Sequence, residues 1–133
     1  MKKSLYMLLA TSFICITTGA LAESGQPTMT TELRPTQKVM QARAGWMKGM
    51  QTNLGAMKYA EVGKDATALA TQTDSIGKTL PNPLAKDLTL KIASAATAVA
   101  NAAGKQDVNT MKMKLADIKA TCDECHAKIR DKK

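Results

Sequence analysis

The sequence predicts an all-α protein, an antiparallel four-helix bundle whose helices run up, down, up and down. Three observations predict this fold. Apolar or small side chains recur at alternating spacings of three and four residues in four segments, and proline or glycine separates the segments. The turn-bounded clusters of β-branched residues that are typical of strands are absent. Short links between amphipathic helices of similar length favour antiparallel neighbours.

The first 22 residues form a segment of their own. Two lysines precede an apolar run, which gives way to small residues that end in Ala20-Leu21-Ala22. This is the layout of a secretory signal peptide, with cleavage after Ala22. Thr11 and Ser12 interrupt the apolar run, which is too short for a membrane anchor, so no stable membrane insertion is expected. Residues 23–133 then form one exported domain, and the expected location is the periplasm.

The charge of the chain indicates the kind of partner. The full sequence has a net charge of +8, and removal of residues 1–22 takes away two lysines, leaving 17 basic against 11 acidic residues, or +6. Such a charge favours encounter with an acidic protein. Nucleic acid is excluded as a partner, because the protein is exported and its lysines are scattered singly.

The first two helices are delimited by prolines. Pro35 suits the first turn of a helix, where its missing N–H costs nothing. The first stripe contains Met40, Arg43, Met47, Met50, Leu54 and Met57. The second stripe contains Val62, Ala66, Leu69, Thr73, Ile76 and Leu80, and it stops where Pro81 and Pro83 forbid continuation.

The third and fourth helices are delimited by Gly104 and Asp107. The third stripe contains Leu84, Leu88, Ile92, Ala95, Val99 and Ala102, and Gly104 is expected to cap its C-terminal end. Asp107 is expected to cap the start of the fourth. The fourth stripe contains Val108, Met111, Leu115, Ile118, Cys122, Cys125 and Ile129, without a break. Many of these positions are alanine or threonine, which bury little apolar surface. A large apolar cofactor between the helices would increase the apolar surface that is buried.

The stretch "CDECH" near the end of the chain is the covalent attachment signature of c-type haem. Cys122 and Cys125 are spaced to reach the two vinyl groups on one porphyrin edge, and His126 follows as an axial ligand to the iron. Three alternatives compete with haem c. A redox dithiol favours a strand-to-helix turn, a zinc site needs a fourth ligand although His126 is the only histidine, and the cysteines could be incidental to a helix end.

Met40 is the candidate for the second axial ligand, on the face of the haem opposite His126. In an antiparallel bundle the start of the first helix lies level with the end of the last, so Met40 is expected to face His126. Met47 and Met50 lie two and three turns further along, about 10 Å or more at 1.5 Å per residue. Methionine on a helical stripe is also ordinary core filling, and seven methionines in residues 23–133 leave a Cu(I)-binding protein as a further alternative.

With CxxCH close to the C-terminus of a four-helix pattern, residues 23–133 resemble the class II c-type cytochromes, the cytochrome c-prime superfamily. The stretch "TQKVMQARAGWM" is similar to the low-spin, six-coordinate branch, and the resemblance implies that Met40 binds the iron. Five-coordinate members commonly carry an arginine one turn before the residue that blocks the distal face, where this sequence has Thr36. Arg43 is a candidate partner for a haem propionate, and a solvated arginine is the alternative.

The sequence therefore predicts a periplasmic carrier of single electrons rather than an enzyme, with one covalent haem c and His126 and Met40 as axial ligands. A five-coordinate cytochrome that binds NO or CO is the alternative function. The expected partner is an acidic redox protein, which lysines such as Lys128, Lys132 and Lys133 would meet. The resemblance also leaves a homodimer open, formed through the first two helices with Trp46 or Tyr59.

Overall fold

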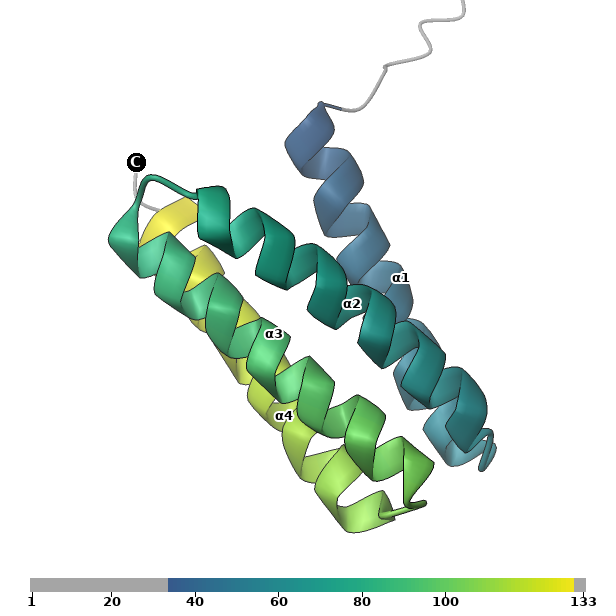
Figure 1. The fold of residues 1–133 in the computed structure, drawn as a ribbon. Coiled ribbons are helices and arrows are strands. Elements are labelled where there is room, and N and C mark those ends of the chain that lie inside the picture. Colours follow the sequence, from purple (N-terminus) through teal and green to yellow (C-terminus); the bar gives the residue numbers. More distant parts are fainter. Residues whose placement is uncertain (1–33, 131–133) are drawn as a thin grey trace, which may run out of the picture. The chain divides into compact units, whose positions relative to one another are not determined.

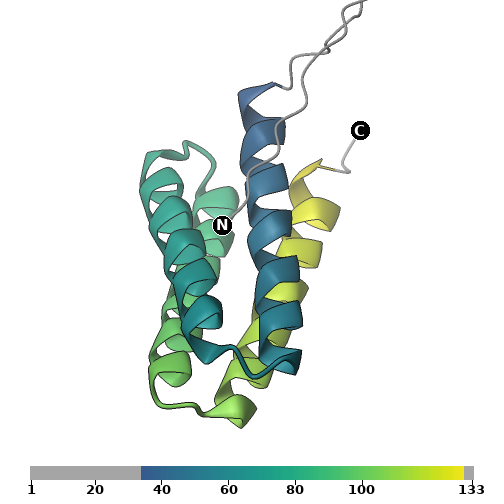
Figure 2. The same ribbon diagram turned by 90° about the vertical axis from the view of Figure 1, so that its right-hand side faces the viewer.

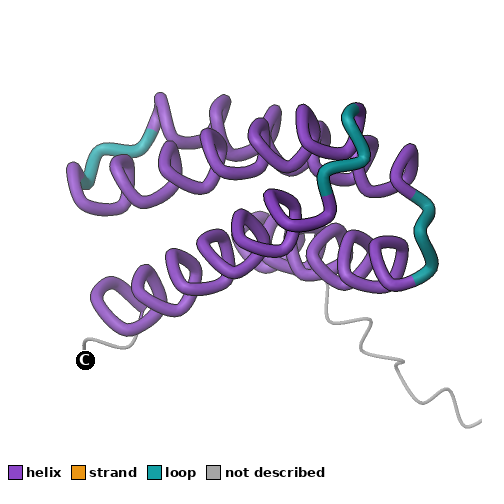
Figure 3. The backbone as a smooth tube through the Cα atoms, turned by 90° about the horizontal axis from the view of Figure 1, so that it is seen from below, coloured by secondary structure: helices purple, strands orange, loops and turns teal. Residues whose placement is uncertain are grey.

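Pro35 begins the first of four helices in the computed structural model, which describes residues 34–130. The helices are α1 (Pro35–Gly55), α2 (Tyr59–Thr79), α3 (Pro83–Gly104) and α4 (Val108–Cys125), followed by a short π-helix, η1 (His126–Arg130) (Figure 1). Three short links, residues 56–58, 80–82 and 105–107, join them (Figure 3). Residues 34–130 contain no strand, so the all-α prediction is confirmed, with four helices packed together.

Side chains just before the helices satisfy backbone N–H groups in the first turns. The Oδ1 atom of Asn82 accepts a hydrogen bond from the backbone N–H of Ala85 at 3.0 Å. Asp107 does the same for Thr110, also at 3.0 Å, as the sequence predicted. Pro35 occupies the first turn of α1, again as predicted. These caps satisfy donors that have no partner within the helix.

The Asp107 cap makes the stability of the bundle depend on acidity. Hydrogen bonds from the hydroxyl and the backbone N–H of Thr110 hold the pKa of the Asp107 carboxyl below its ordinary value. A carboxyl with a lowered folded pKa contributes stability that is present above its unfolded pKa and is lost as pH falls through the folded pKa. Urea unfolding midpoints should therefore fall from neutral pH to about pH 3.

The Asp107→Asn variant is the matched control, because asparagine also caps helices but carries no ionisable group. Its midpoint should fall less over the same pH range than that of the wild type. Equal falls in the two proteins would show that other carboxyls account for the pH dependence.

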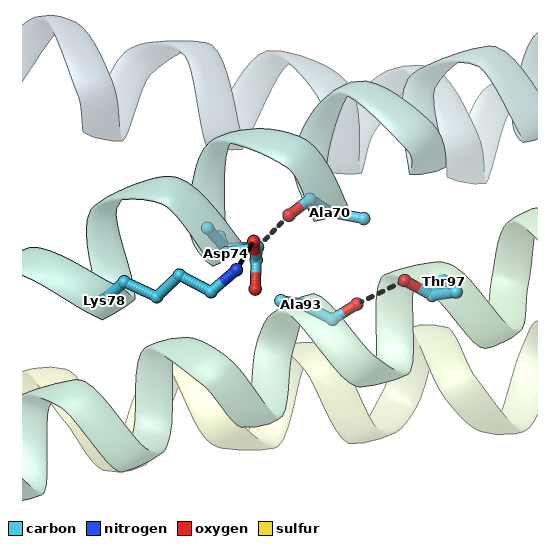
Figure 4. Close-up of polar contacts among 6 residues, drawn as sticks. Ala70, Asp74, Lys78, Ala93 and Thr97 are labelled. Atoms are coloured by element: carbon cyan, nitrogen blue, oxygen red, sulfur yellow. Dashed lines mark hydrogen bonds and ion pairs between the residues drawn. The ribbon is translucent and has the colours of Figure 1, made fainter.

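The core lies mainly among α2, α3 and α4. α2 packs most closely on α3, and α3 packs on α4. The buried apolar residues that form one cluster are Met50, Val62, Ala66, Leu69, Ile92, Ala96, Val99, Ala102, Ala103, Met111, Leu115 and Ile118. Threonines fit into these helices because their hydroxyls donate to carbonyls one turn earlier, as Thr97 does to Ala93 at 2.9 Å (Figure 4).

Gly77 shows how closely α2 approaches α3. A Cβ atom at this position would lie 2.8 Å from the Cδ2 atom of Leu90 and 3.0 Å from its Cγ atom. A larger residue at position 77 would require the Leu90 side chain to move, so glycine allows the leucine of α3 to pack directly on α2. Lys78 and Asp74 of α2 form an ion pair at 2.6 Å on the side of α2 that is next to α3 (Figure 4). Both side chains are largely exposed, and pairs of this kind contribute little stability.

The seam between α1 and α4 is much looser than the other seams. α1 packs on α2 and makes few contacts with α4. It contributes only two buried side chains, Arg43 and Met50. Figure 1 shows the first turns of α1 diverging from the other helices, and Figure 2 shows α1 and α4 on the same side of the bundle. The candidate site lies along this seam.

Three details of the predicted helices were wrong. Met57 was expected on the first apolar stripe, but α1 ends at Gly55 and Met57 lies in the following link, 72 % exposed and with φ of 57°. The third helix ends at Gly104, as predicted, but Lys105 rather than Gly104 is the cap residue, and Gln106 adopts the left-handed conformation that glycine often supplies there, with φ of 55°. The fourth stripe does not continue unbroken to Ile129, because α-helical geometry stops at Cys125.

Candidate functional site

The CxxCH motif lies where helical geometry changes. Cys122 and Cys125 belong to the last turn of α4, whereas His126 is the first residue of η1. The backbone N–H of His126 donates to the carbonyl oxygens of Asp123 and Cys122. All three side chains of the motif are half-buried, and both thiols are free. π-helical turns are rare and often occur at functional sites, because the wider turn redirects the side chains that follow.

A cleft of about 360 Å³ opens between α1 and the end of α4. Six residues of α1 line it: Met40, Arg43, Ala44, Met47, Lys48 and Gln51. The other lining residues are Ile92, Lys119, Cys122, Cys125 and His126. This volume lies within the range of small-molecule and cofactor sites in proteins.

The structure brings together every residue that the sequence singled out for the site. Met40, Arg43, Cys122, Cys125 and His126 all border this cleft. Met40 is the lining residue nearest the start of α1 and is 39 % exposed. The roles assigned to these residues remain predictions, since the structure places the side chains without showing what they bind.

Arg43 is a buried cation within the site. It is only 9 % exposed, and its Nε–H donates to the Oε1 atom of Gln72 at 3.0 Å. Burial lowers the pKa of the guanidinium from its ordinary value, while the nearby Cys122 and Cys125 raise it. Among residues 34–130, no carboxylate forms an ion pair with it. The alternative of a solvated arginine is therefore wrong.

Burial and the charge of Arg43 also act on the pKa of the Cys122 thiol. Burial raises its pKa above the ordinary value, and the Arg43 guanidinium acts in the opposite direction. Burial therefore favours the neutral thiol over the thiolate, in contrast to redox-active dithiols, whose thiolates are stabilised.

Sequence reasoning missed two residues of the site. Met47 was set aside as too far along the helix, yet it lines the same cleft, is half-buried and packs against the core. The cleft extends from Met40 to Gln51, about 16 Å of helix at 1.5 Å per residue, so it is longer than the prediction assumed. Gln72 gave no signal, because its contact with Arg43 depends on how α1 packs on α2.

Lysines border the cleft and its surroundings. Lys48 and Lys119 line it, and Lys119 forms an ion pair with Asp123 at 2.7 Å. Lys128 pairs with Glu124 at 2.5 Å, so part of its charge is already compensated. Residues 1–22, the predicted signal peptide, and Lys132 and Lys133, the predicted partner contacts, lie outside the described residues.

Two features of residues 34–130 concern metal binding and membrane insertion. No three His, Cys, Asp or Glu side chains in this part of the chain converge as a metal site would require. None of its helices has the length and apolar character needed to cross a bilayer.

Comparison of the chain with family models, with curated proteins and with solved structures gives no match in any of the three. The structure itself shows four packed helices, and the cysteines and the histidine of the CxxCH motif border an elongated cleft between α1 and α4.

Proposed function

We propose that this protein is an exported c-type cytochrome that carries single electrons, with one haem bound in the cleft between α1 and α4. Thioether bonds to Cys122 and Cys125 would hold the haem, and His126 would supply one axial ligand. The observation that carries the proposal is that one cleft unites the CxxCH motif with two methionines and a buried cation.

The residues of the cleft fit haem in three respects. Apolar groups of Ala44, Met47 and Ile92 match a flat apolar body. Arg43 is a buried cation that lacks a carboxylate partner among the described residues, and an anionic group on the guest would compensate its charge. The two cysteines are free and one helical turn apart, as attachment to neighbouring vinyl groups requires.

A methionine of α1 would be the second axial ligand. Met40 is the residue that the sequence and the resemblance favour. Met47 is the second candidate and the one that burial favours, because it lies half-buried within the cleft whereas Met40 is 39 % exposed at its end. Methionine–histidine ligation raises the reduction potential of haem iron, and it suits electron transfer without ligand exchange. A carrier of this kind transforms no substrate.

Antiparallel topology is part of this proposal. Each pair of consecutive helices is joined by a link of three residues, and links this short favour antiparallel neighbours. In that arrangement the start of α1 and the end of α4 lie at the same end of the bundle, which agrees with Met40 and His126 bordering one cleft.

An acidic redox protein in the periplasm would be the partner. Lys48 at the cleft supplies positive charge where an electron would enter or leave, whereas Asp123 partly compensates the charge of Lys119. Opposite charge on a partner speeds encounter. A homodimer through α1 and α2 is the alternative assembly. Trp46 and Tyr59 both pack partly against the core, which leaves each of them less surface for such a contact.

The visible spectrum of the protein tests the proposal. Expression with a periplasmic haem-attachment system should give a Soret band, and the colour should remain with the protein after extraction in acidified acetone. The ferrous protein should react slowly with carbon monoxide, because both axial positions are filled. Absence of the Soret band would refute haem binding, whereas rapid carbon monoxide binding would instead establish the five-coordinate, gas-binding alternative.

A further inference from the structure

Gln72 of α2 does not line the cleft, yet it contacts the buried cation inside it. Its Oε1 atom accepts a hydrogen bond from Nε of Arg43 at 3.0 Å. The two residues are 29 positions apart, and the contact joins α2 to α1. Gln72 is half-buried and Arg43 is 9 % exposed, so this bond is partly shielded from water. A hydrogen bond to a charged group in such surroundings is stronger than one between neutral groups.

We propose that Gln72 is a positioning residue, which holds the Arg43 guanidinium so that its terminal N–H groups face an anionic group of the cofactor. This inference rests on the proposed function. It adds a residue of α2 to a site built otherwise from α1, α3, α4 and η1.

The geometry of arginine supports this role. A guanidinium has five N–H donors, of which Nε carries one. Because Gln72 accepts the Nε–H, the planar fork is fixed in orientation and the donors on the two terminal nitrogens remain for another acceptor. That fork matches a carboxylate, which it binds through two parallel hydrogen bonds. Arg43 lines the cleft, so the cleft is where that acceptor would lie.

The chemical identity of residue 72 matters as well. A glutamine side chain is a neutral acceptor, so it orients Arg43 and leaves its positive charge uncompensated. A glutamate at the same position would form an ion pair with Arg43 and compete with the anionic group of the cofactor. The pairing of Arg43 with glutamine therefore fits a cation that is reserved for a charged guest.

A cation fixed near haem iron disfavours the more positive ferric state and so raises the reduction potential. In the Gln72→Met variant the side chain has similar length but its thioether sulfur is only a weak acceptor, so Arg43 should lose its fixed orientation. We expect the reduction potential to fall in this variant, with up to a tenfold change in the equilibrium constant for reduction, about 59 mV for one electron. Gln41→Met, an exposed position on α1, is the matched control and should leave the potential unchanged.

A double-mutant cycle needs two further proteins. One is the single variant Arg43→Met, and the other carries both Arg43→Met and Gln72→Met. If Gln72 acts through Arg43, the Gln72→Met change should have no further effect on the potential once Arg43 is replaced. The same cycle in urea unfolding of the haem-loaded protein should show coupling between the two positions, since either substitution breaks the same hydrogen bond.

Outcomes of this experiment separate the two proposals. Protein that attaches no haem would refute the proposed function, and this inference with it. Protein that attaches haem but shows unchanged potentials in Gln72→Met, or effects of the two substitutions that simply add, would refute the positioning role alone.

Discussion

Replacement of both Cys122 and Cys125 by serine is expected to abolish covalent haem retention. Serine is close to cysteine in size, and both sites are only half-buried, so the bundle should still fold. Without sulfur no thioether bond can form, and any haem that enters the cleft should leave the protein in acidified acetone. The measurement is the Soret absorbance that stays with the protein after extraction, relative to protein concentration.

The two single variants test each attachment site separately. Cys122→Ser and Cys125→Ser should each keep one attachment point and give protein with haem held through one bond. The helical content of all variants, followed by circular dichroism, is the control for folding. A Soret band that survives extraction in the double variant would contradict the assigned attachment sites.

The second large effect is expected at Met47. In the Met47→Ala variant the position opposite His126 should open, the ferric methionine-to-iron charge-transfer band should disappear, and the ferrous protein should bind carbon monoxide rapidly. The reduction potential should also fall, because loss of a thioether ligand removes the axial set that raises it. The physical reason for choosing Met47 is enclosure, since a bond between thioether and iron is better protected within the cleft than at its exposed end.

Met40→Ala is the decisive comparison, and Met113→Ala is the matched control. Met113 is 60 % exposed on α4 and does not line the cleft, so its replacement should change none of these signals. If Met40→Ala rather than Met47→Ala removes the charge-transfer band, Met40 is the ligand, as the sequence predicted. If the wild-type protein lacks the band and binds carbon monoxide rapidly, neither methionine is a ligand and the gas-binding function takes precedence.

Local signals predicted the helices well. Pro35 and Asp107 each act within a single turn of helix, so the starts of α1 and α4 could be placed without knowledge of the packing. The spacing of apolar residues likewise predicted the buried faces of α2 and α3, including Leu69 and Val99.

Features that depend on packing could not be predicted in this way. The burial of Arg43 follows from α1 lying on α2, where Gln72 provides the acceptor. The inclusion of Met47 in the cleft follows from the length over which α1 and α4 stay apart. The change to π-helical geometry at His126 breaks a periodic pattern that the residue types themselves continue.

The loose seam between α1 and α4 has a consequence for how the protein tolerates change. Most apolar burial belongs to the cluster formed mainly by α2, α3 and α4. Of the side chains that border the cleft, Ile92 belongs to this cluster and Met47 and Cys122 pack against it. Substitutions at separated, non-contacting positions tend to have additive effects on stability. Substitutions at exposed lining positions such as Ala44 and Lys48 should therefore cost the fold less stability than substitutions in the cluster.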